Sequence, residues 1–136
     1  MLTQQLSIFI ENTKGRLAEI TGLLGEGGIN MCALSIADTT NFGILRIIAD
    51  QPKKAVDLLK SHQVRVSITE VISVGISDTP GGLAAAVRLL ADNDVSVEYM
   101  YAYVGKTEQA YVVMRVDDNE KAVSLLKANG YKGPEE

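Results

Sequence analysis

The chain has 136 residues, of which 46% are hydrophobic and 22% are charged, with a formal net charge of −4. This composition is typical of a globular protein, and at ~150 residues per domain it predicts one ordinary domain or two very small ones. The acidic balance excludes a basic surface for nucleic acid, and no apolar run approaches the ~20 residues of a membrane helix. The first ten residues show no secretory signal, and one cysteine, Cys32, cannot build a disulfide framework, so we expect a cytoplasmic protein.

The first half of the chain predicts a strand, a helix, a hairpin of two strands, a second helix and a further strand. Thr13 is expected to cap the first helix, Gly27-Gly28 to end it, and Asp50-Gln51-Pro52 to open the second. The strands are predicted at residues 6–10, 29–36, 42–49 and 64–69, with the hairpin turn at 38–41.

The second half predicts the same elements again, apart from the last strand. Thr79 is expected to cap its first helix, with Pro80 as the first helical residue and Asp92-Asn93-Asp94 at the end. Its second helix opens at Asp117-Asp118-Asn119, and only residues 131–136 follow that helix. The last strand is therefore either very short, or the long stretch 64–77 serves both halves. The strands are predicted at residues 71–77, 95–104 and 109–116, with a turn at 105–108.

Internal similarity explains this recurrence, because the two halves match each other at an offset of 66 residues, which becomes 67 near the end. The matches at offset 66 include Ile10/Ile76, Thr13/Thr79, Gly15/Gly81, Leu17/Leu83 and Ala18/Ala84. We therefore predict two domains, residues 1–70 and 71–136, the second with a short or missing last strand. The element order predicts an α+β fold of tandem ferredoxin-like βαββαβ units, each an antiparallel sheet with helices on one face.

Two segments carry a resemblance to a known family. Glu11-Asn12-Thr13-Lys14-Gly15-Arg16-Leu17, followed by Gly28-Ile29-Asn30-Met31, resembles an ACT domain, and Ser77-Asp78-Thr79-Pro80-Gly81-Gly82-Leu83 repeats the signature in its fuller Asp-x-Pro-Gly-x-Leu form. Lys14 stands where the family often has proline. The resemblance implies a sensor of small molecules, most often amino acids, whose units pair side by side with ligand near the loop between first strand and first helix. Without an attached catalytic domain, it implies a free-standing regulatory, allosteric protein.

The residues themselves suit such a ligand, because a helix N-terminus offers unpaired N–H groups to a carboxylate and Gly15 and Gly81 allow close backbone approach. The resemblance assigns effector contacts to Asn12 and Asn30, whose places in the second half are taken by Asp78 and Ser96. The alternative is a plain tight turn before each helix. The candidate ligand-binding residues are Asn12, Thr13, Lys14, Gly15, Arg16, Leu17, Asn30, Met31, Asp78, Thr79, Pro80, Gly81, Gly82, Leu83, Ser96 and Val97.

Other chemistry finds little support in the sequence. His62 and Cys32 are the only residues of their types and lie about 30 residues apart, so we expect no enzyme, catalytic residue, metal or cofactor. Tyr99, Tyr101 and Tyr103 alternate and share one sheet face, which suits packing against a partner or, alternatively, ligand stacking. The expected partners are a free L-amino acid, a second copy in a homo-oligomer (a dimer) and a metabolic enzyme, but neither nucleic acid nor membrane. The competing function is a ligand-free interaction or dimerisation module.

Overall fold

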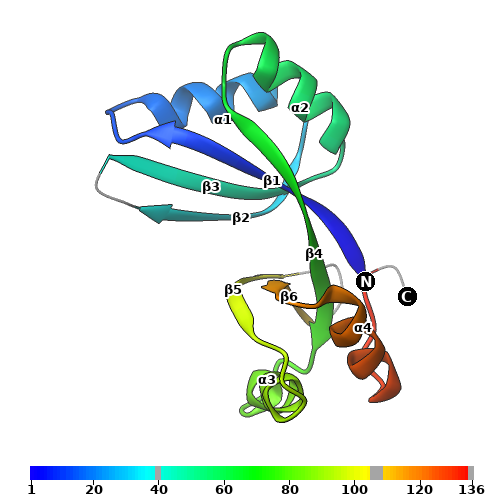
Figure 1. Cartoon of the computed structure of the whole chain (residues 1–136). Coiled ribbons are helices and arrows are strands. Elements are labelled where there is room, and N and C mark those ends of the chain that lie inside the picture. The colour runs from blue at the N-terminus through cyan, green and yellow to red at the C-terminus, as the bar shows by residue number, and fades with distance from the viewer. Residues whose placement is uncertain (39–40, 105–108, 135–136) are drawn as a thin grey trace. The chain divides into compact units, whose positions relative to one another are not determined.

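A computed structural model describes residues 1–38, 41–104 and 109–134 (Figure 1). The order of elements confirms the predicted tandem ferredoxin-like fold, and residues 39–40 and 105–108 of the predicted turns lie outside the described residues. The elements are β1 (Leu2–Glu11), α1 (Arg16–Glu26), β2 (Met31–Asp38), β3 (Phe42–Ala49), α2 (Pro52–Ser61), β4 (Val66–Ile76), α3 (Gly82–Asp92), β5 (Val97–Val104), β6 (Ala110–Val116) and α4 (Asn119–Ala128).

All four helices end in the same way, and this shifts the starts of three strands by two residues from their predicted positions. A residue with positive φ follows each C-cap, and the next residue, an apolar one, donates its N–H to the carbonyl five residues earlier, which is the Schellman arrangement. The apolar residues therefore close the helix ends instead of joining the strands. The pairs are Gly28/Ile29, Gln63/Val64, Asp94/Val95 and Gly130/Tyr131.

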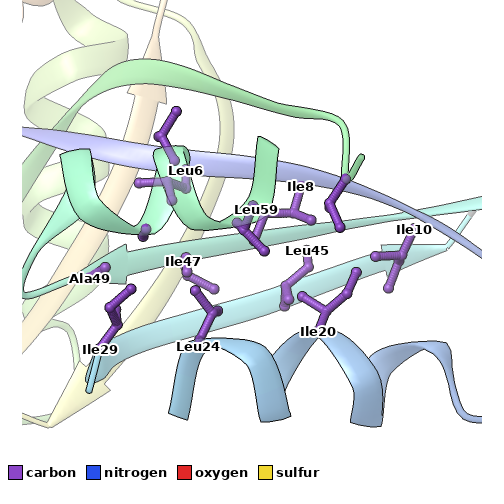
Figure 2. Packing of buried hydrophobic residues seen from close by; sticks show 13 residues of the cluster. Leu6, Ile8, Ile10, Ile20, Leu24, Ile29, Leu45, Ile47, Ala49 and Leu59 are labelled. Atoms are coloured by element: carbon purple, nitrogen blue, oxygen red, sulfur yellow. The ribbon is translucent and has the colours of Figure 1, made fainter. Parts of the chain in front are cut away.

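The chain divides into two compact units, and one of them is Gln4–Thr69. Here β3 pairs antiparallel with both β1 and β2, with Leu6 opposite Ile47 and Ile36 opposite Leu45, and the Phe9 N–H donates to the Arg65 carbonyl at 2.9 Å. Apolar side chains of β1 and β3 meet those of α1 and α2 in one core (Figure 2). The core residues include Leu6, Ile8, Ile20, Leu24, Leu45, Ile47 and Leu59.

The other unit combines Glu70–Glu136 with Met1–Thr3. In this unit β6 pairs antiparallel with both β4 and β5. The hydrophobic core of the unit includes Ile72, Leu90, Met114 and Leu126. The remaining edge of β4 is occupied by two short segments: the Ser73 N–H donates to the Met1 carbonyl and the Gly75 N–H to the Lys132 carbonyl, both at 2.8 Å. Residues from two distant parts of the chain therefore occupy the position of a last strand.

The strand β4 is continuous, where the sequence predicted either two strands that run almost directly into each other or one long stretch, residues 64–77, that serves both halves. Val66–Ile76 is one element, and the boundary between the two units falls within it, at Thr69–Glu70. Successive strands are hydrogen-bonded in the order β2-β3-β1-β4-β6-β5, so β2 and β5 are the terminal strands. No helix in the described part of the chain is long and apolar enough to cross a membrane.

Candidate functional site

The loop between the first strand and first helix of each unit is a tight turn ending on glycine. Gly15 has φ 88° and ψ −10°, and Gly81 has φ 86° and ψ −7°, values that match the third residue of a type II turn. The turns are closed by the Arg16 N–H donating to the Thr13 carbonyl and the Gly82 N–H donating to the Thr79 carbonyl. The same backbone geometry thus precedes both helices.

This geometry overturns the predicted helix caps. The N-cap residues are Gly15 and Gly81, with no side-chain cap, whereas Thr13 and Thr79 begin the turns two residues earlier. The Thr79 hydroxyl is hydrogen-bonded to the Ser77 hydroxyl at 2.9 Å instead. Pro80 takes the second turn position, which its fixed φ favours, and is not the first helical residue.

Each helix start carries backbone donors without acceptors. The first i to i−4 hydrogen bonds of the helices are donated by the Glu19 N–H to the Gly15 carbonyl and by the Ala85 N–H to the Gly81 carbonyl, both at 3.0 Å. In each helix, the two residues between the one that closes the turn and the first i to i−4 donor have N–H groups with no acceptor among the described residues, as expected for the first turn of a helix. These groups belong to Leu17, Ala18, Leu83 and Ala84.

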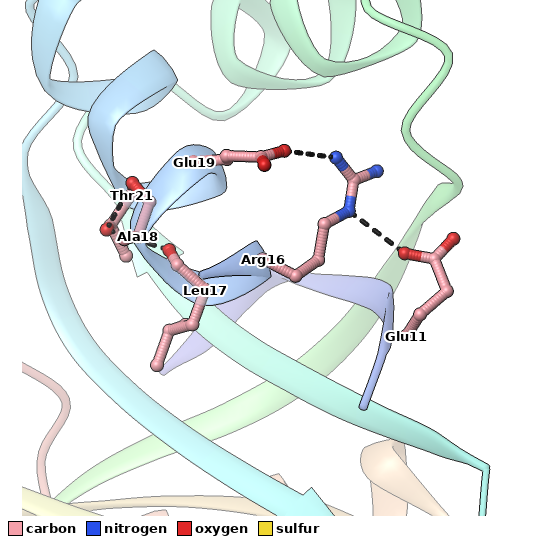
Figure 3. A network of polar contacts seen from close by, with 6 residues as sticks. All are labelled: Glu11, Arg16, Leu17, Ala18, Glu19 and Thr21. Atoms are coloured by element: carbon pink, nitrogen blue, oxygen red, sulfur yellow. Dashed lines mark hydrogen bonds and ion pairs between the residues drawn. The ribbon is translucent and has the colours of Figure 1, made fainter. Parts of the chain in front are cut away.

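A charged network lies beside the first helix start. Arg16 Nε donates to Glu11 at 2.9 Å and Arg16 Nη1 donates to Glu19 at 3.0 Å (Figure 3). The hydrogen bond that the guanidinium donates to Glu19, together with the charge of Glu11, raises the pKa of Arg16 above its ordinary value. The two carboxylates therefore hold the Arg16 guanidinium in place beside the start of α1.

The second helix start lacks this network, since Ser77, Gly82 and Ala85 replace its three members. The close packing of Gly82 excludes any side chain, because a Cβ there would lie 2.1 Å from the Ser77 carbonyl oxygen. The two turns therefore share the φ and ψ of their glycines, but they differ in how closely the preceding strand approaches the helix and in electrostatics, since Asp78 also replaces Asn12.

The predicted site residues do not all come together within one unit. Asn12 follows the end of β1, where its side-chain amide donates to the Asp38 carboxylate at the end of β2. Asn30 precedes the start of β2, with its N–H donating to Asp50 Oδ1 at 2.9 Å. Because Glu11 pairs with Phe42 at one end of β3 and Met31 with Ala49 at the other, these asparagines lie roughly 20 Å apart.

The second unit repeats this separation. Asp78 follows the end of β4, whereas the Ser96 N–H donates to Asp117 Oδ1 at 3.0 Å before the start of β5. The turn residues 12–17 and 78–83 thus form one group in each unit, and Asn30 with Met31, or Ser96 with Val97, forms another at the opposite end of the sheet.

The three tyrosines of β5 share the sheet face without helices. Tyr99, Tyr101 and Tyr103 lie opposite Arg115, Val113 and Tyr111 of β6. The Tyr103 and Tyr111 rings stack with centroids 5.5 Å apart, and the Tyr103 hydroxyl is hydrogen-bonded to Ser73 at 3.1 Å. These contacts give Tyr103 a packing role inside its own unit.

The turn glycines yield a direct test of this geometry. No atom would crowd a Cβ at Gly15 or Gly81, so Gly15→Ala or Gly81→Ala carries only the cost of positive φ, about 1–2 kcal/mol. Gly25→Ala, in open space inside α1, should instead stabilise by about 0.5–1 kcal/mol. Urea unfolding of the three variants checks this, and equal effects at Gly15 and Gly25 would contradict the turn assignment.

The chain has the fold of the regulatory subunits of aspartate kinase from Thermus thermophilus (ligand-free form) and Thermus flavus. The Thermus thermophilus subunit has a TM-score of 0.65 and 16% identity, over 93% of this chain and 92% of its own. The Thermus flavus subunit has a TM-score of 0.64 and 18% identity, over 94% of this chain and 92% of its own. The family model for an ACT domain pair matches residues 1–132, so the chain belongs to the ACT domain family.

A more similar structure is that of protein BT0572 from Bacteroides thetaiotaomicron. It has 39% identity and a TM-score of 0.91, over 97% of this chain and 91% of that one. No functionally curated protein matches the chain.

Proposed function

We propose that this ACT domain pair is a non-enzymatic, cytoplasmic regulatory protein that binds a free amino acid near the turns preceding α1 and α3. The observation that carries the proposal is the duplicated turn, with Gly15 at φ 88° and Gly81 at φ 86°, next to helix-start N–H groups without acceptors in the described residues. Such donors at the positive end of a helix dipole suit an α-carboxylate.

The amino group of the ligand needs an acceptor, and each unit offers a different one. Beside α1 this is the Asn12 and Asp38 pair, and beside α3 it is the Asp78 carboxylate. Arg16, held by Glu11 and Glu19, adds a positive charge only beside α1. We therefore expect two unequal sites, and an acidic ligand group could bind Arg16 only by displacing Glu11 or Glu19.

Pairing of units or of whole chains is part of the proposal. Asn12 and Asn30 lie at opposite ends of one sheet, so a single unit cannot offer both to a small ligand. An antiparallel junction between two edge strands brings the start of one strand beside the end of the other. A ligand at that junction would shift the equilibrium between paired and unpaired states, because it binds the two states with different affinity. The change in pairing would regulate a metabolic enzyme.

A thermal-shift screen with the twenty protein amino acids, the chiral ones in both L- and D-forms, tests the proposal. Ligand at about 100 times its dissociation constant should stabilise the protein by roughly 2.7 kcal/mol, a rise in Tm of several degrees. The rise should be specific for the L-form and should be reduced in Asn12→Ala or Gly81→Val, each compared with its own ligand-free Tm. A flat screen at millimolar ligand would overturn the proposal in favour of a ligand-free interaction module.

A further inference from the structure

An open groove lies where α3 ends and β5 begins, in the unit of residues 70–136. Its volume is about 540 Å³, and four of its six lining residues are apolar. Ala91 and Ser96 are exposed and Val87 and Val97 are half-buried, so a side chain from outside the unit can reach the apolar wall. The lining residues are Val87, Ala91, Asp94, Val95, Ser96 and Val97.

Carboxylates surround this groove. Asp94 lines it and Asp92 ends α3 beside it, and neither forms an ion pair with another residue in the described part of the chain. Asp117 is joined to the groove through Ser96, whose N–H donates to Asp117 Oδ1 at 3.0 Å. Closely spaced like charges repel one another, so a cation at this end of the unit is attracted by all of them. The exposed acidic residues here are Asp92, Asp94, Asp117, Asp118 and Glu120.

The internal repeat shows that this charge is particular to one unit. Six positions at this end hold five acidic residues and one lysine, whereas the six corresponding positions of the other unit hold two acidic residues and two lysines. In addition, α3 has no basic residue in its last turn, where α2 has Lys60 and α4 has Lys127. The negative end of the α3 dipole therefore adds to the carboxylates. The compared positions are 92, 94, 117, 118, 120 and 121 here and 26, 28, 50, 51, 53 and 54 there.

We propose that this groove docks a basic segment of the enzyme that the protein regulates. An aliphatic side chain of that segment fills the groove, and lysine or arginine side chains beside it meet the surrounding carboxylates. The inference rests on the proposed regulatory function and adds the docking surface and the chemistry of the partner. In such an interface apolar contact supplies affinity, while complementary charges speed association and select the partner.

The position of the groove fits a regulatory contact. It includes Ser96 and Val97, which lie at the opposite end of the sheet from the turn of residues 78–83. A docked segment therefore leaves that turn open to an amino acid. A second copy of this chain is disfavoured as the occupant, because a two-fold contact at the groove would bring its carboxylates against their own copies.

Two synthetic peptides test the proposal on the full chain: one of alternating lysine and leucine, and its counterpart with glutamate in place of lysine. In heteronuclear NMR spectra the lysine peptide should shift the amide signals of residues 87–97 and 117–121 in a saturable manner, and the glutamate peptide should not. The affinity should fall as salt is added, because the carboxylates are exposed. Absence of binding, or shifts centred on another part of the protein, would overturn the proposal.

Charge-matched variants separate this groove from a general attraction to an acidic protein. Asp92→Asn combined with Asp94→Asn should weaken binding of the lysine peptide by at least about tenfold. Asparagine tolerates the positive φ of residue 94, so the fold is kept. Glu26→Gln combined with Asp57→Asn makes the same change in net charge in the other unit and should leave the affinity unchanged. Equal losses in the two double variants would contradict the assignment.

Filling the groove tests the apolar contact without a change in charge. Ala91→Gln places a longer uncharged side chain in the groove and should weaken binding several-fold, whereas Gly25→Gln, its counterpart on α1, should not. Unchanged affinity in Ala91→Gln would mean that the carboxylates act without the groove, and the docking site would be wrong. The amino-acid screen is carried out without peptide, so failure of docking and failure of amino-acid binding are distinguished.

Discussion

Gly82→Ala is expected to be among the most damaging single-methyl additions in this protein, lowering the free energy of unfolding by about 2–4 kcal/mol. The new Cβ would lie 2.1 Å from the carbonyl oxygen of Ser77 and 3.1 Å from its carbonyl carbon. Both are backbone atoms at the end of the strand that enters the turn, so no side-chain rotation relieves the clash. Either the first turn of α3 or the end of β4 must move.

A matched glycine in the other helix separates this clash from helix propensity. Gly22 lies inside α1, where a Cβ would have no atom within 4 Å, so Gly22→Ala should raise stability by about 0.5–1 kcal/mol. Urea unfolding of both variants measures the difference. If Gly82→Ala were as stable as Gly22→Ala, the close approach of α3 to Ser77 would be wrong.

The same contact bears on the inequality of the two proposed sites. Arg16 occupies the position of Gly82 in the repeat and extends to Glu11 and Glu19. Gly82 has no room for any side chain, so the start of α3 cannot acquire an equivalent charge without a change in backbone. The difference between the sites is therefore built into the packing of the turn as well as into the side chains.

Local patterns predicted most of the fold. The strand 42–49 and the second-helix starts were placed correctly, since Asp118 accepts from the Lys121 N–H and Pro52 opens α2. The predicted threonine caps were wrong for a physical reason: Thr-x-Gly fits a type II turn as well as it fits a capped helix start, and only the φ of the glycine distinguishes them.

The candidate site was less predictable, because its contacts join distant segments. The turn at Gly15 could be found from its own sequence. The bond from Asn12 to Asp38 spans 26 residues, and although Asp38 begins the predicted turn 38–41, no local signal identifies it as the partner of Asn12. The separation of Asn12 from Asn30 depends on the strand register. A motif read along the chain cannot reveal that two of its members lie at opposite ends of a sheet.

Gly133→Val is expected to destabilise the unit of residues 70–136 by about 1–3 kcal/mol, through overpacking where residues 1–3 meet the end of the chain. A Cβ at Gly133 would lie 2.9 Å from Met1 Cα and 3.0 Å from Met1 N. Displacing Met1 would weaken its carbonyl's bond to Ser73 and remove its side chain from the core of this unit. Hydrogen exchange should show faster exchange at the Ser73 N–H than in the wild type.

The neighbouring position provides the control. Lys132→Ala keeps the carbonyl that accepts from the Gly75 N–H and removes only an exposed side chain, so it should leave stability within about 0.5 kcal/mol of the wild type. Leu2 and Thr3 of β1 belong to this unit, whereas Leu6 and Ile8 of the same strand lie in the core of the other unit. Loss of this contact therefore frees one end of a strand that both units share. Unchanged protection of Ser73 in Gly133→Val would mean that Met1 does not complete the sheet.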